Sequence, residues 1–131
     1  MRKIALLVLL VAACGGDSGP TGTSAFNLTG TFIGSYTATL QPGTVFEGVF
    51  QLTQNGNNVT GTMTTNAGRS GALAASLSGT RLTGTITFTD GCNGTAQTTA
   101  DITNGGTRMA GNYTANDCTG QYSGGYLVIK Q

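Results

Sequence analysis

The chain has 131 residues, of which 8% are charged, and its formal net charge is +1. This length allows one domain, and the few scattered charges provide no basic surface for nucleic acid, so we expect no nucleic-acid partner. Apolar residues in fair supply, together with abundant Gly and Thr, argue against a disordered tail and favour a folded, β-rich protein.

The amino terminus has the layout of a secretory signal. Residues 1–3 form a short basic start, residues 4–11 are apolar but too few to span a bilayer as a helix, and small residues follow. We therefore predict that residues 1–13 are a signal peptide. Residues 14–25 are rich in Gly, Ser and Thr without an apolar period, so we predict a flexible tether there.

The end of this signal, Val11-Ala12-Ala13-Cys14, resembles the lipobox of bacterial lipoproteins. The resemblance implies that Cys14 is the first residue of the mature protein and carries several acyl chains, palmitate among them. Each buried methylene adds roughly 0.8 kcal/mol, so such chains would hold the protein stably to a membrane. Gly15, which is not Asp, implies the outer membrane by the same resemblance. The expected location is the bacterial cell envelope, with the domain outside the cytoplasm.

The remaining chain, residues 26–131, repeats one strand-and-turn unit. In Leu82–Phe88 the apolar residues alternate with Thr, as in a half-buried β-strand, and Leu-Thr-Gly-Thr or a close variant recurs elsewhere. The segment 71–77 is also compatible with one or two helical turns, but its length and flanking Gly favour a strand. With Gly, Asn, Asp and Pro as boundaries, eight strands are predicted at 29–40, 45–53, 59–65, 71–77, 82–88, 95–103, 109–115 and 121–130.

Short connections between these strands leave no room for crossover helices. The sequence therefore predicts an all-β, antiparallel up-and-down meander, and pairing of the last strand with the first would close it into a small eight-stranded barrel and remove its edges. A β-sandwich is the alternative. An even number of strands returns the chain to the end at which it entered the barrel.

Cys92 and Cys118 are predicted to form a disulfide. With Cys14 used for lipid, these two cysteines remain as a pair in a compartment where disulfides persist, and the meander brings their loops to the same end. Two free thiols or a metal pair are the competing interpretation. The chain has no His to complete a zinc site, so we expect no metal and no cofactor.

Groups for catalysis are scarce. The chain has no His and one Glu, so general bases and nucleophile activators are nearly absent and we expect no enzyme activity. Asp90 and Asp117 should approach each other beside the disulfide, in the manner of a carboxylate dyad or a calcium site. Because each lies in a Gly- or Asn-containing loop, turn formation is the favoured interpretation.

Gly30-Thr31-Phe32 is similar to the Gly-x-Trp of the first strand in lipocalins and avidins, with Phe in place of Trp. The resemblance implies an eight-stranded barrel whose interior holds one small ligand. Two functions follow: a monomeric binding module for a small apolar molecule entering at the Cys92/Cys118 end, or a structural or surface-interaction lipoprotein with a filled barrel. The predicted ligand-lining residues are Phe32, Tyr36, Phe46, Phe50, Met63, Phe88 and Tyr113.

Overall fold

The computed structural model describes residues 26–131. The predicted signal peptide (1–13), the lipidation site Cys14 and the tether (14–25) lie outside the described residues. Among residues 26–131, no helix is long and apolar enough to cross a bilayer.

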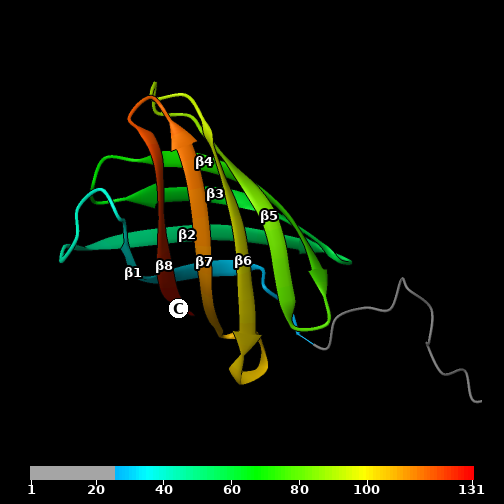
Figure 1. The fold of residues 1–131 in the computed structure, drawn as a ribbon. Coiled ribbons are helices and arrows are strands. Elements are labelled where there is room, and N and C mark those ends of the chain that lie inside the picture. The colour runs from blue at the N-terminus through cyan, green and yellow to red at the C-terminus, as the bar shows by residue number, and fades with distance from the viewer. Residues whose placement is uncertain (1–25) are drawn as a thin grey trace, which may run out of the picture.

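Eight antiparallel strands close into one barrel in which each strand pairs with its neighbours in sequence (Figure 1). β1 and β8 complete the closure, with a register that runs from Phe32 opposite Lys130 to Tyr36 opposite Tyr126. The predicted barrel is confirmed and the sandwich alternative is wrong. The strands are β1 (Gly30–Thr37), β2 (Val45–Asn55), β3 (Asn58–Thr65), β4 (Ser70–Ser78), β5 (Arg81–Phe88), β6 (Thr95–Thr103), β7 (Arg108–Asp117) and β8 (Gly120–Lys130).

The alternation of apolar and polar residues in the sequence corresponds to alternating buried and exposed side chains along the strands. β6 shows it most regularly, because Ala96, Thr98, Ala100 and Ile102 are buried and the residues between them are exposed. β4 follows the same rule, with Leu73 and Leu77 facing inward, so its helical alternative is wrong.

The connections divide between two ends of the barrel. The hairpins after β2, β4 and β6, the entry of the chain and its carboxyl terminus lie at one end, which we call the base. In the β2–β3 hairpin, Gly56 has a φ of 61°, a conformation that side chains disfavour. The loops after β1, β3, β5 and β7 lie at the opposite end, which we call the mouth.

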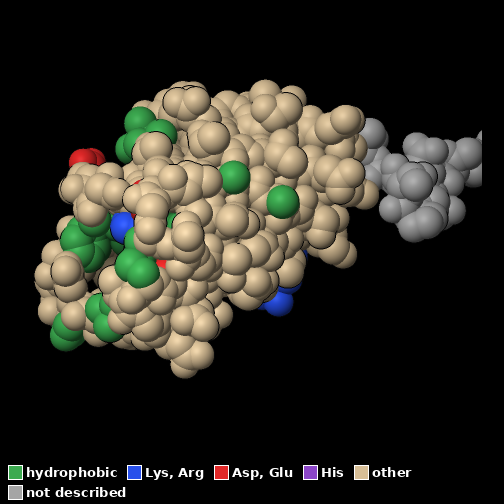
Figure 2. Space-filling view, turned by 90° about the horizontal axis from the view of Figure 1, so that it is seen from above, with side chains coloured by type: hydrophobic (Ala, Val, Ile, Leu, Met, Phe, Trp, Pro, Cys, Tyr) green, Lys and Arg blue, Asp and Glu red, His purple; other side chains and the backbone are tan. Residues whose placement is uncertain are grey.

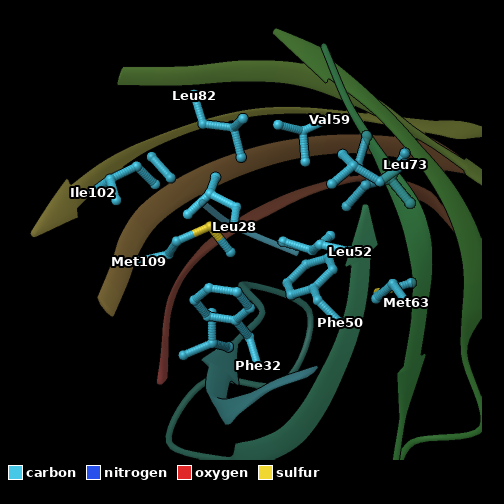
Figure 3. Packing of buried hydrophobic residues seen from close by; sticks show 14 of the residues in the cluster. Leu28, Phe32, Phe50, Leu52, Val59, Met63, Leu73, Leu82, Ile102 and Met109 are labelled. Carbon is cyan, nitrogen blue, oxygen red and sulfur yellow. The ribbon is translucent and has the colours of Figure 1, made fainter. Parts of the chain in front are cut away.

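The base is filled by packed side chains. Leu28, which precedes β1, enters the barrel from below and lies among Leu52, Val59, Leu82 and Met109 (Figure 3). Burial of each such side chain contributes about 1.5–3 kcal/mol. The largest fully buried side chains are Phe32, Leu28, Leu82, Met109, Val59 and Val128.

Polar contacts hold the entering chain in place over this core. The backbone amide of Leu28 donates to the side-chain Oε1 of Gln54 at 2.8 Å. The backbone amide of Gln54 in turn donates to the Thr29 hydroxyl at 2.9 Å. Nζ of Lys130 donates to the carbonyl of Asn27 at 2.9 Å. The segment before β1 therefore acts as the floor of the barrel.

Candidate ligand-binding site

A cavity of about 250 Å³ opens at the mouth of the barrel. Figure 2 shows hydrophobic side chains gathered at one end of the molecule, with basic and acidic side chains among them. The cavity is lined by inward side chains of the strands and by residues of three mouth loops: Ser35, Tyr36, Ala38, Leu40, Gln41, Phe46, Gly48, Phe50, Met63, Thr65, Ala67, Arg69, Ile86, Phe88, Ala96, Tyr113, Thr119, Tyr122, Tyr126 and Val128.

Six of the seven residues predicted to line a ligand site border this cavity, and Phe32 does not. Phe32 is completely buried in the filled base, because its position on β1 lies nearer the floor than Tyr36 does. The six that border the cavity are Tyr36, Phe46, Phe50, Met63, Phe88 and Tyr113.

Aromatic rings in mutual contact form much of the cavity wall. Tyr36 stacks on Phe46 with ring centroids 5.1 Å apart and meets the edge of Tyr113 at 6.5 Å. Tyr113 in turn meets Tyr122 edge-on at 6.1 Å. Edge-to-face and offset contacts of this kind each add about 0.5–1.5 kcal/mol to burial. The rings of the cavity wall therefore hold one another in position.

Tyr113 is held in place across β8. It pairs with Gly124, and a Cβ on that glycine would lie 2.8 Å from the Tyr113 hydroxyl oxygen. With no side chain there, the Tyr113 ring reaches over β8 to β1, where its hydroxyl donates to the Thr37 carbonyl at 2.6 Å. Burial, with a smaller effect of Tyr36, raises the pKa of Tyr113 to about 12.

A second tyrosine, Tyr126, pairs with the one buried polar residue of the described core. The Thr98 hydroxyl donates to the Asn112 carbonyl at 3.1 Å and lies 2.7 Å from the Tyr126 hydroxyl. Because the single Thr98 proton goes to Asn112, Tyr126 is the donor to Thr98. Burial raises the pKa of Tyr126, and its ring packs beside Phe50 at 5.8 Å.

Arg69, Asp90, Asp117 and Tyr122 form a hydrogen-bonded group that we call the mouth cluster. Nε of Arg69 donates to Asp90 at 2.6 Å, and Nη1 donates to Asp117 at 2.6 Å and to the Tyr122 hydroxyl at 3.2 Å. Nη2 donates to the Cys92 carbonyl at 3.4 Å. The guanidinium also lies 4.1 Å from the ring centroid of Phe88, within cation–π distance.

Both carboxylates of the mouth cluster are held in their charged form. The pKa of Asp117 is lowered, because hydrogen bonds from Thr119, Tyr122 and Arg69 outweigh the opposing effect of burial. The pKa of Asp90 is lowered chiefly by its bond from Arg69 and then by the Ser70 amide. Burial and the bond to Asp117 raise the pKa of Tyr122, which therefore stays a neutral donor.

The two aspartates also form the turns predicted for them. Asp90 accepts from the Cys92 amide at 3.0 Å, and Asp117 accepts from the Thr119 amide at 2.8 Å, each two residues ahead. Sequence reasoning missed Arg69 as their shared partner. It also missed Tyr122 and Tyr126 as lining residues, although their spacing on one face of β8 was a usable signal.

The predicted disulfide between Cys92 and Cys118 is present, with the two Cα atoms 5.1 Å apart. It joins the β5–β6 loop to the β7–β8 turn directly beside the mouth cluster. The two sulfurs and a carboxylate oxygen of Asp117 lie within 4.8 Å of one another. Because the bridge uses both sulfurs and Asp117 accepts from Arg69, Tyr122 and Thr119, these atoms are already engaged.

Two solved structures share this fold. EF1p2_mFAP2b, in a structure bound to DFHBI, superposes with a TM-score of 0.65 at 16% sequence identity, over 79% of this chain and 94% of that chain. A redesigned β-barrel, mFAP1, also bound to DFHBI, superposes with a TM-score of 0.56 at 17% identity over the same shares. At such identities the likeness shows the β-barrel fold alone. No known protein family and no curated protein matches the sequence.

Proposed function

We propose that this protein is a non-catalytic binding module for a small, mostly apolar ligand, carried on a lipid-anchored protein of the bacterial cell envelope. The observation that carries the proposal is the cavity at the mouth, enclosed by aromatic rings above a filled base. Its volume of about 250 Å³ is close to the lower end of the usual range for ligand pockets, about 300 Å³. A small ligand fits this space best.

The absence of catalysis is part of the same proposal. The chain has no His, and both carboxylates of the mouth cluster already accept several hydrogen bonds, which supports a binding role over general acid–base chemistry. Similar barrels bind a small molecule in their solved structures, which supports the same role.

Anchoring through Cys14 is the second element of the proposal. The disulfide favours a compartment outside the cytoplasm, where the lipobox-like motif would place the domain. In a bacterial host, Cys14→Ser or the signal-peptidase inhibitor globomycin should leave the precursor uncleaved and block acylation, as read by intact mass and detergent partitioning. Release of a processed, lipid-free domain into the medium would refute the anchor and leave the binding role untouched.

Ligand binding is tested with N-phenylnaphthylamine, an uncharged dye that fluoresces in apolar surroundings. We expect saturable fluorescence and a rise in melting temperature, since a ligand at 100 times its Kd adds about 2.7 kcal/mol to the stability of the native state. Gly48→Leu should abolish both effects, because a Cβ at Gly48 meets only ordinary contacts, at 3.5 Å or more, and the side chain would occupy the cavity.

The matched control is Ala74→Leu, which adds a Leu side chain on the exposed face of β4 and should leave dye binding unchanged. Equal loss of binding in both variants, or no binding to the unaltered protein, would contradict the proposed function.

A surface-interaction role is the second candidate, and one observation favours it. Ile33 on β1 is 37% exposed and pairs with Ile129 on β8, which is 49% exposed, so two aliphatic side chains lie together on the outer wall. If the dye fails to bind while Ile33→Thr/Ile129→Thr removes a membrane- or protein-association signal, this second role replaces the first.

A further inference from the structure

Many of the hydrogen-bond donors around the described cavity are already used within the protein, although the lining residues Tyr36 and Gln41 carry further donors. Each nitrogen of Arg69 donates to a protein acceptor, as described above. The hydroxyl protons of Tyr113, Tyr122 and Tyr126 go to Thr37, Asp117 and Thr98 in turn. Each of these tyrosine oxygens can still accept a hydrogen bond. Arg69 and these three tyrosines therefore offer a ligand few donors, whereas the tyrosine oxygens can still accept.

The mouth carries more negatively charged side chains than positively charged ones. Arg69 is the one charged side chain that lines the described cavity, and it is paired with two carboxylates, Asp90 and Asp117. The side chain of Asp117 is fully shielded from solvent. Glu47 lies at the same end, since its amide and carbonyl bond Asn66 of the β3–β4 loop.

The base carries the opposite imbalance. Three basic residues, Arg81, Arg108 and Lys130, stand at strand ends there against one acidic side chain, Asp101, which pairs with Arg81. Within residues 26–131 the negative side chains thus concentrate at the mouth and the positive ones at the base. A field of this direction draws cations toward the cavity and repels anions.

The walls favour a flat ligand that tolerates positive charge. Four rings in sequence, Phe46, Tyr36, Tyr113 and Tyr122, present π faces and edges to the space between them. Aromatic faces attract planar molecules by stacking and cationic groups by their quadrupole, with about 0.5–2 kcal/mol for each cation–π contact.

From these observations we infer that the cavity selects a flat aromatic ligand bearing an amine or another hydrogen-bond donor, and that it discriminates against carboxylates. The inference rests on the proposed binding function and narrows it to a ligand class. Arg69, the one cation at the cavity, acts as a structural cross-link of the mouth loops and leaves no guanidinium nitrogen without a protein acceptor.

The test is a matched series of three naphthalene probes measured by calorimetry: naphthylmethylamine, a cation at neutral pH; naphthalenemethanol, which is uncharged; and naphthoate, an anion. We expect the amine to bind at least as tightly as the alcohol, and naphthoate to bind at least about tenfold more weakly, a difference of about 1.4 kcal/mol. Naphthoate binding as tight as the amine would overturn the ligand class while leaving the binding function in place. Failure of all three probes and of N-phenylnaphthylamine would refute the binding function itself.

Asp90→Asn then removes one negative charge at the mouth, and Asp101→Asn removes the same charge at the base, where Asp101 is largely exposed. We expect the amine-over-naphthoate preference to shrink by about threefold or more in the first variant and to stay unchanged in the second. If Asp90→Asn does not fold, raising salt from about 10 mM to about 500 mM should shrink the same preference in the unaltered protein. A preference insensitive to both charge and salt would contradict the electrostatic basis.

Discussion

At the scale of single residues, the mouth of the barrel depends on one guanidinium shared by two carboxylates. Replacing Arg69 with Met would leave Asp117 charged, shielded from solvent and without its cationic partner. We expect a loss of about 3 kcal/mol in the free energy of unfolding, as is typical when one member of a buried ion pair is removed. Urea unfolding followed by circular dichroism measures this loss.

The chain supplies a matched control in its exposed ion pair. Arg81 and Asp101 lie 3.5 Å apart with side chains 63% and 64% exposed, so Arg81→Met should change stability by at most about 0.5 kcal/mol. The double variant Arg69→Met/Asp117→Asn should recover part of the stability lost by Arg69→Met, because it no longer contains the Asp117 carboxylate without its cationic partner. Equal effects of Arg69→Met and Arg81→Met would show that the mouth cluster contributes nothing beyond a surface pair.

Acid should weaken the protein through the same residues. The folded pKa values of Asp117 and Asp90 lie below their usual value of about 3.9, so these carboxylates contribute stability that is complete above about pH 4 and is lost as the pH falls below it. Unfolding free energies measured between about pH 2 and pH 7 should decline at the acid end. Asp117→Asn should flatten that decline, and parallel curves for the two proteins would contradict the assignment.

The turn-forming role of Asp90 and Asp117 was predictable from sequence, and their partner was not. An Asp that bonds an amide two residues ahead depends on local sequence alone. Arg69 meets these residues across separations of 21 and 48 positions, which only the closed barrel brings together.

At the scale of elements, one glycine pair shows why β1 and β8 can close. Gly34 on β1 and Gly48 on β2 pair directly, and both point inward. A Cβ at Gly34 would collide with the Leu127 carbonyl oxygen on β8, whereas one at Gly48 would meet ordinary contacts only. Gly34→Ala should therefore cost about 1–3 kcal/mol, while Gly48→Ala should be neutral or slightly stabilising.

Thermal unfolding of the two alanine variants, side by side, measures this contrast. The positions share a strand pair and a side-chain change, so they differ mainly in what the added methyl meets. A Gly48→Ala variant as unstable as Gly34→Ala would show that strand coiling in general, and not the approach of β8, requires these glycines.

The alternation of apolar and polar residues predicted the strands well, because a period of two residues can be recognised in the sequence without knowledge of the tertiary structure. All eight exist, including β4, whose Ala-rich middle was also compatible with a helix. Strand ends were less predictable: β1 stops at Thr37, and Leu40, the last residue of the predicted strand, lies in the following loop with half of its surface exposed. Leu40 instead borders the cavity from the β1–β2 loop.

At the scale of the whole molecule, the disulfide closes a loop with a sequence separation of 26. A bridge of this span stabilises a fold by about 3.5 kcal/mol in the chain-entropy account. Reduction, or Cys92→Ser/Cys118→Ser, should lower the urea midpoint accordingly. Intact mass should rise by two hydrogens on reduction, and a reduced protein with an unchanged midpoint would contradict the expected stabilisation.

The depth to which the cavity reaches into the barrel was beyond the reach of the sequence. Alternation states whether a side chain points inward but not its height above the floor, which depends on strand register. Phe32 was consequently assigned to the cavity although it lies in the base, and Leu28, outside every predicted strand, proved to be part of the floor. The six predicted residues that do line the cavity were identified because inward side chains on β1, β2, β3, β5 and β7 face the space at the mouth.

The division of the interior into a filled base and a hollow mouth bears on how this protein can evolve. The base is packed with side chains, whereas lining residues such as Tyr36 and Phe46 border open space. Point mutations of lining residues such as these would change the proposed ligand preference while the packed base stays intact. Under the proposed function, lineages descending from this chain should therefore diversify in what they bind while they retain the same barrel.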